Sequence, residues 1–382
     1  MRDRWLVLSV AAYYAIALTV RLSVDDAGVW YWLFFPTTTA NPVFLDASIL
    51  IYGSKCGEEG FALYEPNACL NGLLGTPGYV FNYPPYLTGL AAPFATETGI
   101  AAFSIFQAAL FLCACCAVVS KITDPTARRT SYLLLITYPV SLVIERGNYE
   151  QLTFALVVLF CFLASSGKPS RQIAGLIALA VAGAAKLLPF AAAAALLRRP
   201  FQLACIAVVA GSIYYSNADA IASIARVTMQ ETLTSFGLVQ LSTLNGAPWL
   251  VVMTVAALVS GAIVGRSAAR QTALSQSLAI AGTSIVALAY FTMLSWDYRL
   301  INLLMCLPAI TSSVRRPWLA VLYYGVMSWA SSFGHHIFAL DELMVAGLLG
   351  YCCALSAKAL LRGAADVPQA PRRPVFGSGD PR

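Results

Sequence analysis

The sequence predicts an all-α fold, a polytopic membrane protein with about 12 transmembrane helices. The chain of 382 residues is 59% hydrophobic and only 11% charged, whereas a soluble domain carries roughly 25% charged residues. Apolar runs of about 17–25 residues, each long enough to cross the hydrocarbon layer, recur along the chain. These runs are continuous and rich in Ala and Leu. They do not alternate as the short strands of a membrane β-barrel would, so the predicted spans are helices.

Charged or turn-forming residues separate the candidate spans. We expect the first span to be a retained helix, because no small-residue cleavage site follows it. Residues 188–198 form the shortest span and predict a half-helix returning from a re-entrant turn. The candidate spans are 5–24, 99–122, 131–147, 150–167, 171–186, 188–198, 201–217, 248–265, 273–295, 300–314, 317–333 and 342–362.

Basic residues predict the orientation, because short cytoplasmic loops carry an excess of Lys and Arg. With both termini cytoplasmic, most of the 24 basic residues fall in inner segments, and this distribution explains the net charge of +6. No basic patch interleaved with aromatic residues is present, so a nucleic-acid partner is not expected. The basic residues outside the inner segments are Arg21, Lys55, Arg146, Lys186, Arg226 and Arg299.

One transmembrane domain, residues 1–362, precedes a Pro-, Gly- and Arg-rich tail, residues 363–382, which we expect to be disordered and cytoplasmic. The long polar segment 25–98 is the first extracytoplasmic loop. It contains an apolar stretch, Val43–Tyr52, that we expect to form a short helix along the membrane surface.

Ten cysteines are present, and all but two lie in apolar runs, where we expect them to act as small hydrophobic residues. Cys56 and Cys69 lie in the polar loop instead. An extracytoplasmic loop favours a disulfide between them, and two free thiols are the alternative.

Polar residues that depart from the apolar pattern gather at the predicted outer ends of the spans. An ionisable group at membrane depth is costly and therefore indicates function, so we expect one cavity at the outer leaflet. The residues are Asp46, Phe81-Asn82-Tyr83-Pro84-Pro85, Glu145–Glu150, Lys186–Pro189, Trp296–Arg299, His335 and His336.

The residue types of this cavity suit a lipid phosphate. Arg146 and Arg299 can fork onto phosphate oxygens, while Lys186 supplies a mobile point charge. A carboxylate such as that of Asp46 can take a proton from a hydroxyl. The combination predicts group transfer from a lipid phosphate to an alcohol. We expect neither a cofactor nor a divalent metal; the alternative metal site would combine Asp46 with the two histidines.

Each charge also has a structural alternative. Arg146 can pair with Glu150, one helical turn away, and Lys186 can extend to the interface. Asp297 and Arg299 can pair with other loops, and the histidines can cap a span. The joint occurrence of these groups on one side of the membrane favours a functional site.

Short motifs follow one another in a recognisable order. The first loop carries Asp46-x5-Tyr52-Gly53, Gly60-x2-Leu63-Tyr64 and Phe81-x-Tyr83-Pro84-Pro85. Arg146-Gly147-Asn148, Lys186-x2-Pro189 and Asp297-Tyr298-Arg299-Leu300 come later. Over roughly residues 1–362, this pattern resembles the bacterial GT-C glycosyltransferases, in particular the polyprenyl-phosphate-mannose-dependent mannosyltransferases.

The resemblance implies an inverting glycosyltransferase of the bacterial inner (plasma) membrane, with its active site on the extracytoplasmic face. Mannose, or another hexose or pentose, would move from a polyprenyl-phosphate donor to a hydroxyl of a glycolipid or envelope glycan, with membrane lipids as surroundings. By position, Asp46 matches the family's general base. It lacks the aromatic residue that often follows the family's acid closely, so Asp25 and Asp26 stay open as the base.

The resemblance also assigns roles to other residues. Lys186 and Arg299, with Arg146 as a third, match the basic residues that hold the donor phosphate. His335 or His336 matches a donor-site histidine. The remaining candidates for substrate binding are Tyr83, Asn148, Glu150 and Asp297.

Two other functions stay open, a transporter or flippase of a lipid-linked saccharide and a non-catalytic assembly factor for envelope polysaccharide. Transporters usually place ionisable residues near the membrane midplane and show repeated halves. This chain places them at the outer ends of spans and shows no clear inverted duplication, which favours the enzyme.

Overall fold

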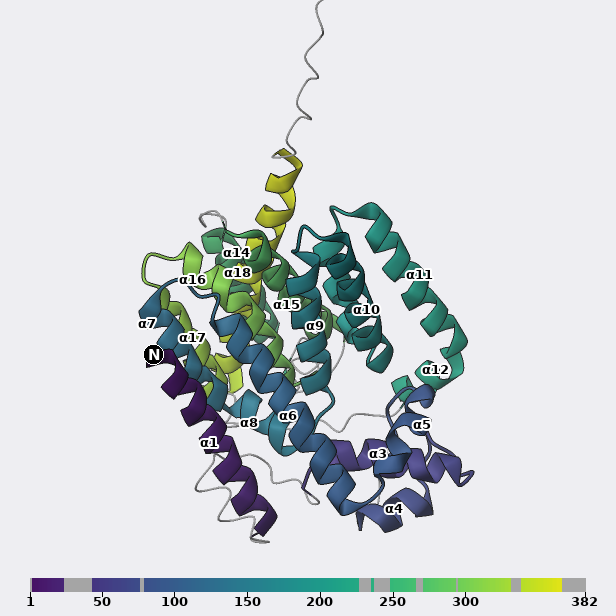
Figure 1. Cartoon of the computed structure of the whole chain (residues 1–382). Helices are drawn as coiled ribbons and strands as arrows, with labels where there is room; N and C mark the ends of the chain where they lie inside the picture. Colours follow the sequence, from purple (N-terminus) through teal and green to yellow (C-terminus); the bar gives the residue numbers. More distant parts are fainter. Residues whose placement is uncertain are drawn as a thin grey trace, which may run out of the picture.

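The computed structural model describes residues 2–23, 43–75, 79–226, 235–236, 248–265, 271–292, 295–330 and 338–365. These residues are helical apart from loops and one two-residue antiparallel pair, β1 (Ser235–Phe236) with β2 (Ser295–Trp296). Figure 1 shows the helices as a bundle with a small helical cluster at its lower end. The predicted all-α class is therefore confirmed, while most of the predicted tail and the residues Asp25, Asp26, His335 and His336 lie outside the described part.

Membrane-spanning length is reached by four of the described helices. They are α1 (Arg2–Ser23), α6 (Glu97–Val119), α15 (Ala273–Thr292) and α18 (Phe338–Ala365). The shorter apolar helices include α9 (Glu150–Ala164), α10 (Pro169–Ala185), α11 (Pro200–Ser216), α14 (Pro248–Gly265) and α17 (Pro317–Ala330). The length and apolarity of the four helices support a membrane-embedded protein, but 12 separate spans are not confirmed.

Breaks shorten the helices in the middle of the chain. The predicted span 131–147 is divided into α7 (Pro125–Leu133), a 3₁₀ turn η3 (Leu134–Ile136) and α8 (Tyr138–Glu145). Helix α8 then meets α9 at a bend of 116°, so the two form one broken span or a re-entrant loop.

Other predicted spans are also interrupted or replaced by 3₁₀ segments. A 3₁₀ segment, η4 (Leu188–Leu196), replaces the predicted half-helix. The predicted span 300–314 consists of η5 (Asp297–Cys306) and α16 (Leu307–Ser313). A short helix that the sequence did not predict, α12 (Ala218–Arg226), follows α11.

The segment predicted as the first outer loop folds, in its described part, into a compact cluster of short helices. These are α3 (Leu45–Glu58), α4 (Ala68–Leu74), η1 (Pro85–Leu87), α5 (Thr88–Ala91) and η2 (Ala92–Phe94). In Figure 1, α3 runs across the lower ends of the bundle helices. Its apolar residues Leu45, Ile49, Leu50 and Ile51 are buried in protein. The expected helix therefore forms, and its apolar residues pack within the protein, while its position along the membrane surface stays a prediction.

One disulfide and one close packing contact hold α3 in this cluster. A disulfide joins Cys56 of α3 to Cys69 of α4, with 5.9 Å between the Cα atoms, which is the predicted pairing. Gly53 allows the ring of Phe81 to lie directly on the helix, because a Cβ at this position would stand only 2.5 Å from the ring. The Tyr52-Gly53 and Phe81 motifs thus meet in space.

Candidate functional site

Asp46 lies in the first turn of α3, and that turn is fixed to the connection between α8 and α9. The backbone N–H groups of Phe44 and Asp46 donate to the carbonyl oxygens of Glu145 (3.2 Å) and Arg146 (3.0 Å). The loop enters α3 with Phe44 in the left-handed region, φ 59°. These contacts place the Asp46 side chain beside residues about 100 positions later in the sequence.

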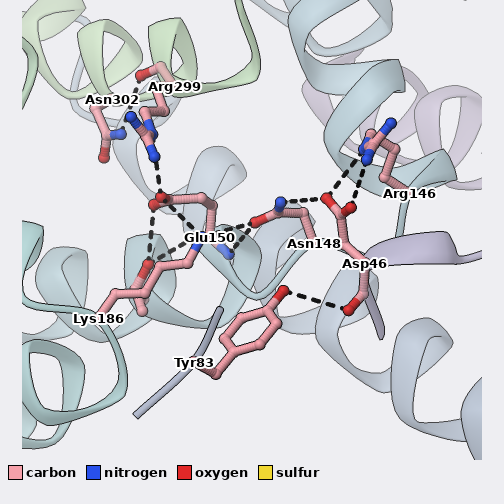
Figure 2. A network of polar contacts seen from close by, with 9 residues as sticks. Asp46, Tyr83, Arg146, Asn148, Glu150, Lys186, Arg299 and Asn302 are labelled. Atoms are coloured by element: carbon pink, nitrogen blue, oxygen red, sulfur yellow. Dashed lines mark hydrogen bonds and ion pairs between the residues drawn. The ribbon is translucent and has the colours of Figure 1, made fainter. Parts of the chain in front are cut away.

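The carboxylate of Asp46 accepts hydrogen bonds from two side chains of the α8–α9 connection (Figure 2). Arg146 forks onto it, with Nη2 at 2.6 Å from Oδ1 and Nε at 3.0 Å from Oδ2. Asn148 donates from Nδ2 to Oδ2 at 2.5 Å. Bidentate, charge-assisted contacts of this kind are strong and directional, so they fix the orientation of the carboxylate.

A second carboxylate, that of Glu150, contacts two cations that come from distant elements. Its Oε1 lies 3.1 Å from Nζ of Lys186, at the end of α10, and 3.7 Å from Nε of Arg299, in η5. Its Oε2 accepts from the Thr153 hydroxyl at 3.3 Å. Helix α9 begins at Glu150, so the carboxylate also stands at the positive end of that helix dipole.

Asn148 joins the two carboxylate clusters into one network. While its Nδ2 donates to Asp46, its Oδ1 accepts from Lys186 Nζ at 3.3 Å and from the backbone N–H of Glu150 at 2.8 Å. Figure 2 shows the continuous path from Arg146 through Asp46 and Asn148 to Arg299. Five charged residues from four separate regions of the chain therefore share one network of hydrogen bonds and ion pairs.

Aromatic residues of the first loop cover this network. The Tyr83 hydroxyl donates to the Asp46 carbonyl oxygen at 3.3 Å, and Lys186 Nζ lies 5.9 Å from the Tyr83 ring centroid. Tyr86 donates to the carbonyl oxygen of Ala184 in α10. The Tyr64 hydroxyl donates to the Tyr83 carbonyl oxygen at 3.1 Å, and burial raises the pKa of Tyr64. The segment around Tyr83 thus ties α3 to the end of α10.

The network is buried, and cations form much of its described part. Asp46 is 7% exposed, Glu150 2% and Arg299 7%. With Arg146 and Lys186 included, the described part of the network brings three cations to two carboxylates. Guanidinium and ammonium groups gathered in one buried cluster suit an anionic ligand, because they can form charge-assisted hydrogen bonds to its oxygens.

Most of the residues predicted for the cavity are brought together. Asp46, Arg146, Lys186 and Arg299 all belong to the network, as do Tyr83, Asn148 and Glu150. The alternative pairing of Arg146 with Glu150 is wrong, because Glu150 pairs with Lys186 and Arg299. Lys186 is only 18% exposed and turns inward rather than extending to the interface.

Some predicted residues are not placed by the structure. The backbone of Asp297 begins η5, but its side chain lies outside the described part of the structure, and so do Asp25, Asp26, His335 and His336. The alternative metal site with the histidines therefore has no structural counterpart to compare. Within the described ranges, no group of three or more His, Cys, Asp or Glu residues could hold a metal ion.

Two residues in or beside the site, Asn302 and Arg21, were not predicted as site residues from the sequence. Asn302 donates from Nδ2 to the carbonyl oxygen of Arg299 at 3.0 Å and so fixes the η5 turn. Behind the α8–α9 connection, Arg21 of α1 lies 3.9 Å from Glu145, and both are buried. The pair had a visible signal, because Arg21 is a basic residue on the predicted outer side. Asn302 had none, because a single amide in an apolar run predicts no partner.

A small cavity lies on the opposite side of the connection, between α1 and α8. Its lining includes Tyr13, Tyr14, Ser141 and Glu145.

Comparison with known proteins adds no relative: no family model, curated protein or solved structure matches this chain.

Proposed function

We propose that the protein is a membrane glycosyltransferase that moves a sugar from a polyprenyl-phosphate carrier to a hydroxyl of a glycolipid or envelope glycan. The observation that carries the proposal is the Asn148 bridge, because it joins a carboxylate of the first loop to a cation cluster. A proton acceptor and an anion-binding group within one buried network are what such a transfer requires.

In the proposed reaction, the acceptor oxygen attacks the anomeric carbon of the sugar while its proton passes to the Asp46 carboxylate. The bond between the anomeric carbon and the phosphate oxygen breaks, and its electron pair stays on the polyprenyl phosphate. Attack opposite the leaving group inverts the anomeric configuration. Asp46 then releases its proton to water, which restores the starting state.

Lys186 and Arg299 stabilise the leaving phosphate in this scheme. Both now contact the same oxygen of Glu150, so the carboxylate occupies the place that a phosphate oxygen would take. Fixed cations in a site of low dielectric constant stabilise the charge that develops in the transition state. Arg146 has a different role from the phosphate contact expected for it, because its guanidinium is engaged by Asp46.

Purified protein incubated with radiolabelled polyprenyl-phosphate mannose and a pool of cell glycolipids tests the proposal. We expect a labelled product with inverted anomeric configuration by NMR. Polyprenyl-phosphate glucose and arabinose run in parallel identify the sugar. Absence of a new glycosidic bond with every donor and acceptor would argue against an enzyme.

Asp46→Asn is the decisive variant. Loss of the proton acceptor should lower kcat by about 10²- to 10⁴-fold, with donor binding retained. Asp3→Asn is the matched control, because Asp3 pairs with Arg128 and Arg129 far from the network. Equal turnover of wild type and Asp46→Asn would remove Asp46 from the reaction.

A second variant separates the two substrates. Lys186→Ala should raise the KM for the donor about 10- to 100-fold, because a charged hydrogen bond to the phosphate is lost. The acceptor KM should change little. Lys55→Ala is the control, since Lys55 is 43% exposed on the loop surface. Equal loss of affinity for donor and acceptor would argue against phosphate contact by Lys186.

Transport of a lipid-linked saccharide is the second candidate, and the broken helices favour it. Transporters often build their sites where helices are interrupted, and here the α8–α9 bend and η5 both contribute to the network. Movement of a fluorescent polyprenyl-phosphate sugar across proteoliposomes, without a new glycosidic bond, would support this function over transfer.

A further inference from the structure

Asn148 was expected to contact substrate, but its surroundings indicate another role. It is 2% exposed, and both ends of its amide are engaged by protein groups. We propose that Asn148 is a positioning residue that orients the Asp46 carboxylate and connects it to the cation cluster.

Only one orientation of the Asn148 amide satisfies its neighbours. The Glu150 backbone N–H and the Lys186 ammonium are donors, so the atom facing them must be the amide oxygen. The amide nitrogen then faces Asp46 Oδ2, an acceptor. The backbone contact is fixed by the start of α9, so Asn148 keeps its orientation even when Lys186 moves toward a phosphate.

This arrangement distinguishes the two oxygens of Asp46. Oδ2 accepts from Arg146 Nε and Asn148 Nδ2, whereas Oδ1 accepts from Arg146 Nη2. A carboxylate oxygen has two lone pairs, so Oδ2 is saturated by these donors and Oδ1 retains capacity. This arrangement also has a consequence for the reaction, which rests on the proposed function. Oδ1 is the oxygen that takes the proton of the acceptor hydroxyl.

The charged groups around Asp46 predict how its protonation depends on Asn148. Arg146 faces the carboxylate directly, and the Tyr83 hydroxyl contacts its backbone. Lys186 and Glu150 lie beyond Asn148, and the Arg21–Glu145 pair lies behind the connection. Removal of the Asn148 donor leaves Arg146 as the remaining side-chain donor to the carboxylate, so the ionised form loses a hydrogen bond and its fixed orientation.

Carbodiimide labelling tests this role without any assay of transfer. A hydrophobic carbodiimide reacts with protonated carboxyl groups, and peptide mass spectrometry of the full-length protein in detergent measures the modification of Asp46 at each pH. We expect the extent of Asp46 labelling at a fixed pH to rise several-fold in Asn148→Leu, because the carboxylate loses one of its two side-chain donors. It should rise further in Asn148→Asp, which adds a second negative charge beside Asp46. Asn148→Ser removes the same donor with a smaller, polar side chain, because its hydroxyl is too short to reach Oδ2.

Asp124 serves as the internal control in the same samples. Its carboxylate caps α7 by accepting from the Ala127 N–H at 2.6 Å, so its labelling should be unchanged when the variant is folded. An unchanged labelling profile of Asp46 in Asn148→Ser and Asn148→Asp, with Asp124 as in wild type, overturns the positioning role.

Kinetics then separate this inference from the proposed function. If wild type transfers sugar, Asn148→Ser should lower kcat with little change in donor KM, the opposite of Lys186→Ala. If the labelling profile shifts while wild type forms no glycosidic bond, Asn148 positions Asp46 and the proposed function falls. If transfer occurs but neither kcat nor the labelling profile responds to Asn148, the function stands and the inference falls.

Discussion

Gly147 lies where three elements meet, between Arg146 and Asn148. Its φ is +59°, a region that L side chains rarely adopt, and a Cβ there would lie 2.7 Å from Ser104 Oγ and 3.0 Å from Ala47 Cβ. The residue therefore allows α6, α3 and the α8–α9 connection to approach one another. The geometry of Asp46 depends on this contact.

Gly147→Ala should destabilise the protein by about 1–3 kcal/mol through backbone strain and the close contact. A lower midpoint of thermal unfolding in detergent would measure this effect. Gly72→Ala is the control, because Gly72 lies in α4 with nothing within 4 Å of its Cβ position, and alanine favours a helix there. Equal midpoints for the two variants would show that the turn tolerates a side chain.

At this scale, the sequence predicted the members of the site better than their contacts. Scarcity of charge in apolar surroundings marked Asp46, Lys186 and Arg299 as functional candidates. The sequence could not show which charges pair, because Arg146 has carboxylates near it in sequence and in space. The fold decides, since the α3 backbone docks on the connection and brings Asp46 to the guanidinium.

Helix α3 supplies Asp46 at its first turn and is held at its other end by the disulfide. Cys56 is fully buried near the end of α3, and its bond to Cys69 fixes α4 against it. The bridge therefore limits movement of the element that positions the carboxylate.

Cys69→Ser should lower the free energy of unfolding by about 2–4 kcal/mol, because the loop between the cysteines regains freedom in the unfolded chain. Chemical unfolding in detergent measures the change, and a reductant should reproduce it in wild type. Cys205→Ser provides the control, since Cys205 is a free, exposed thiol in α11. The same loss in both cysteine variants would contradict a specific role of the disulfide.

Helix breaks were the least predictable elements. Hydropathy along 131–147 is continuous, yet Pro139 lies at the start of α8, and Pro189 and Pro308 likewise lie in the first turn of η4 and α16. Proline lacks the N–H that a continuing helix needs, so it favours the beginning of a new segment. Apolar composition alone reports burial or lipid contact and does not report the direction of a helix axis.

Across the whole molecule, the native lysines test the predicted orientation. In right-side-out membrane vesicles, a membrane-impermeant amine reagent should modify Lys55 but leave Lys121 and Lys168 unmodified. In lysed vesicles the reagent should modify all three lysines, because Lys121 and Lys168 are exposed and the side chain of Lys55 is 43% exposed. Mass spectrometry identifies each site. Modification of Lys55 and Lys168 from the same side would contradict the predicted topology.

The wide sequence separation of the network partners has a consequence for biosynthesis. Asp46 leaves the ribosome 100 residues before Arg146, an interval of about 5–20 s at ordinary rates of translation. During that time the carboxylate is hydrated, while Cys56 and Cys69, only 13 residues apart, can already be oxidised. We therefore expect the disulfide to be able to form before Asp46 meets Arg146, because both cysteines precede Arg146 in the chain.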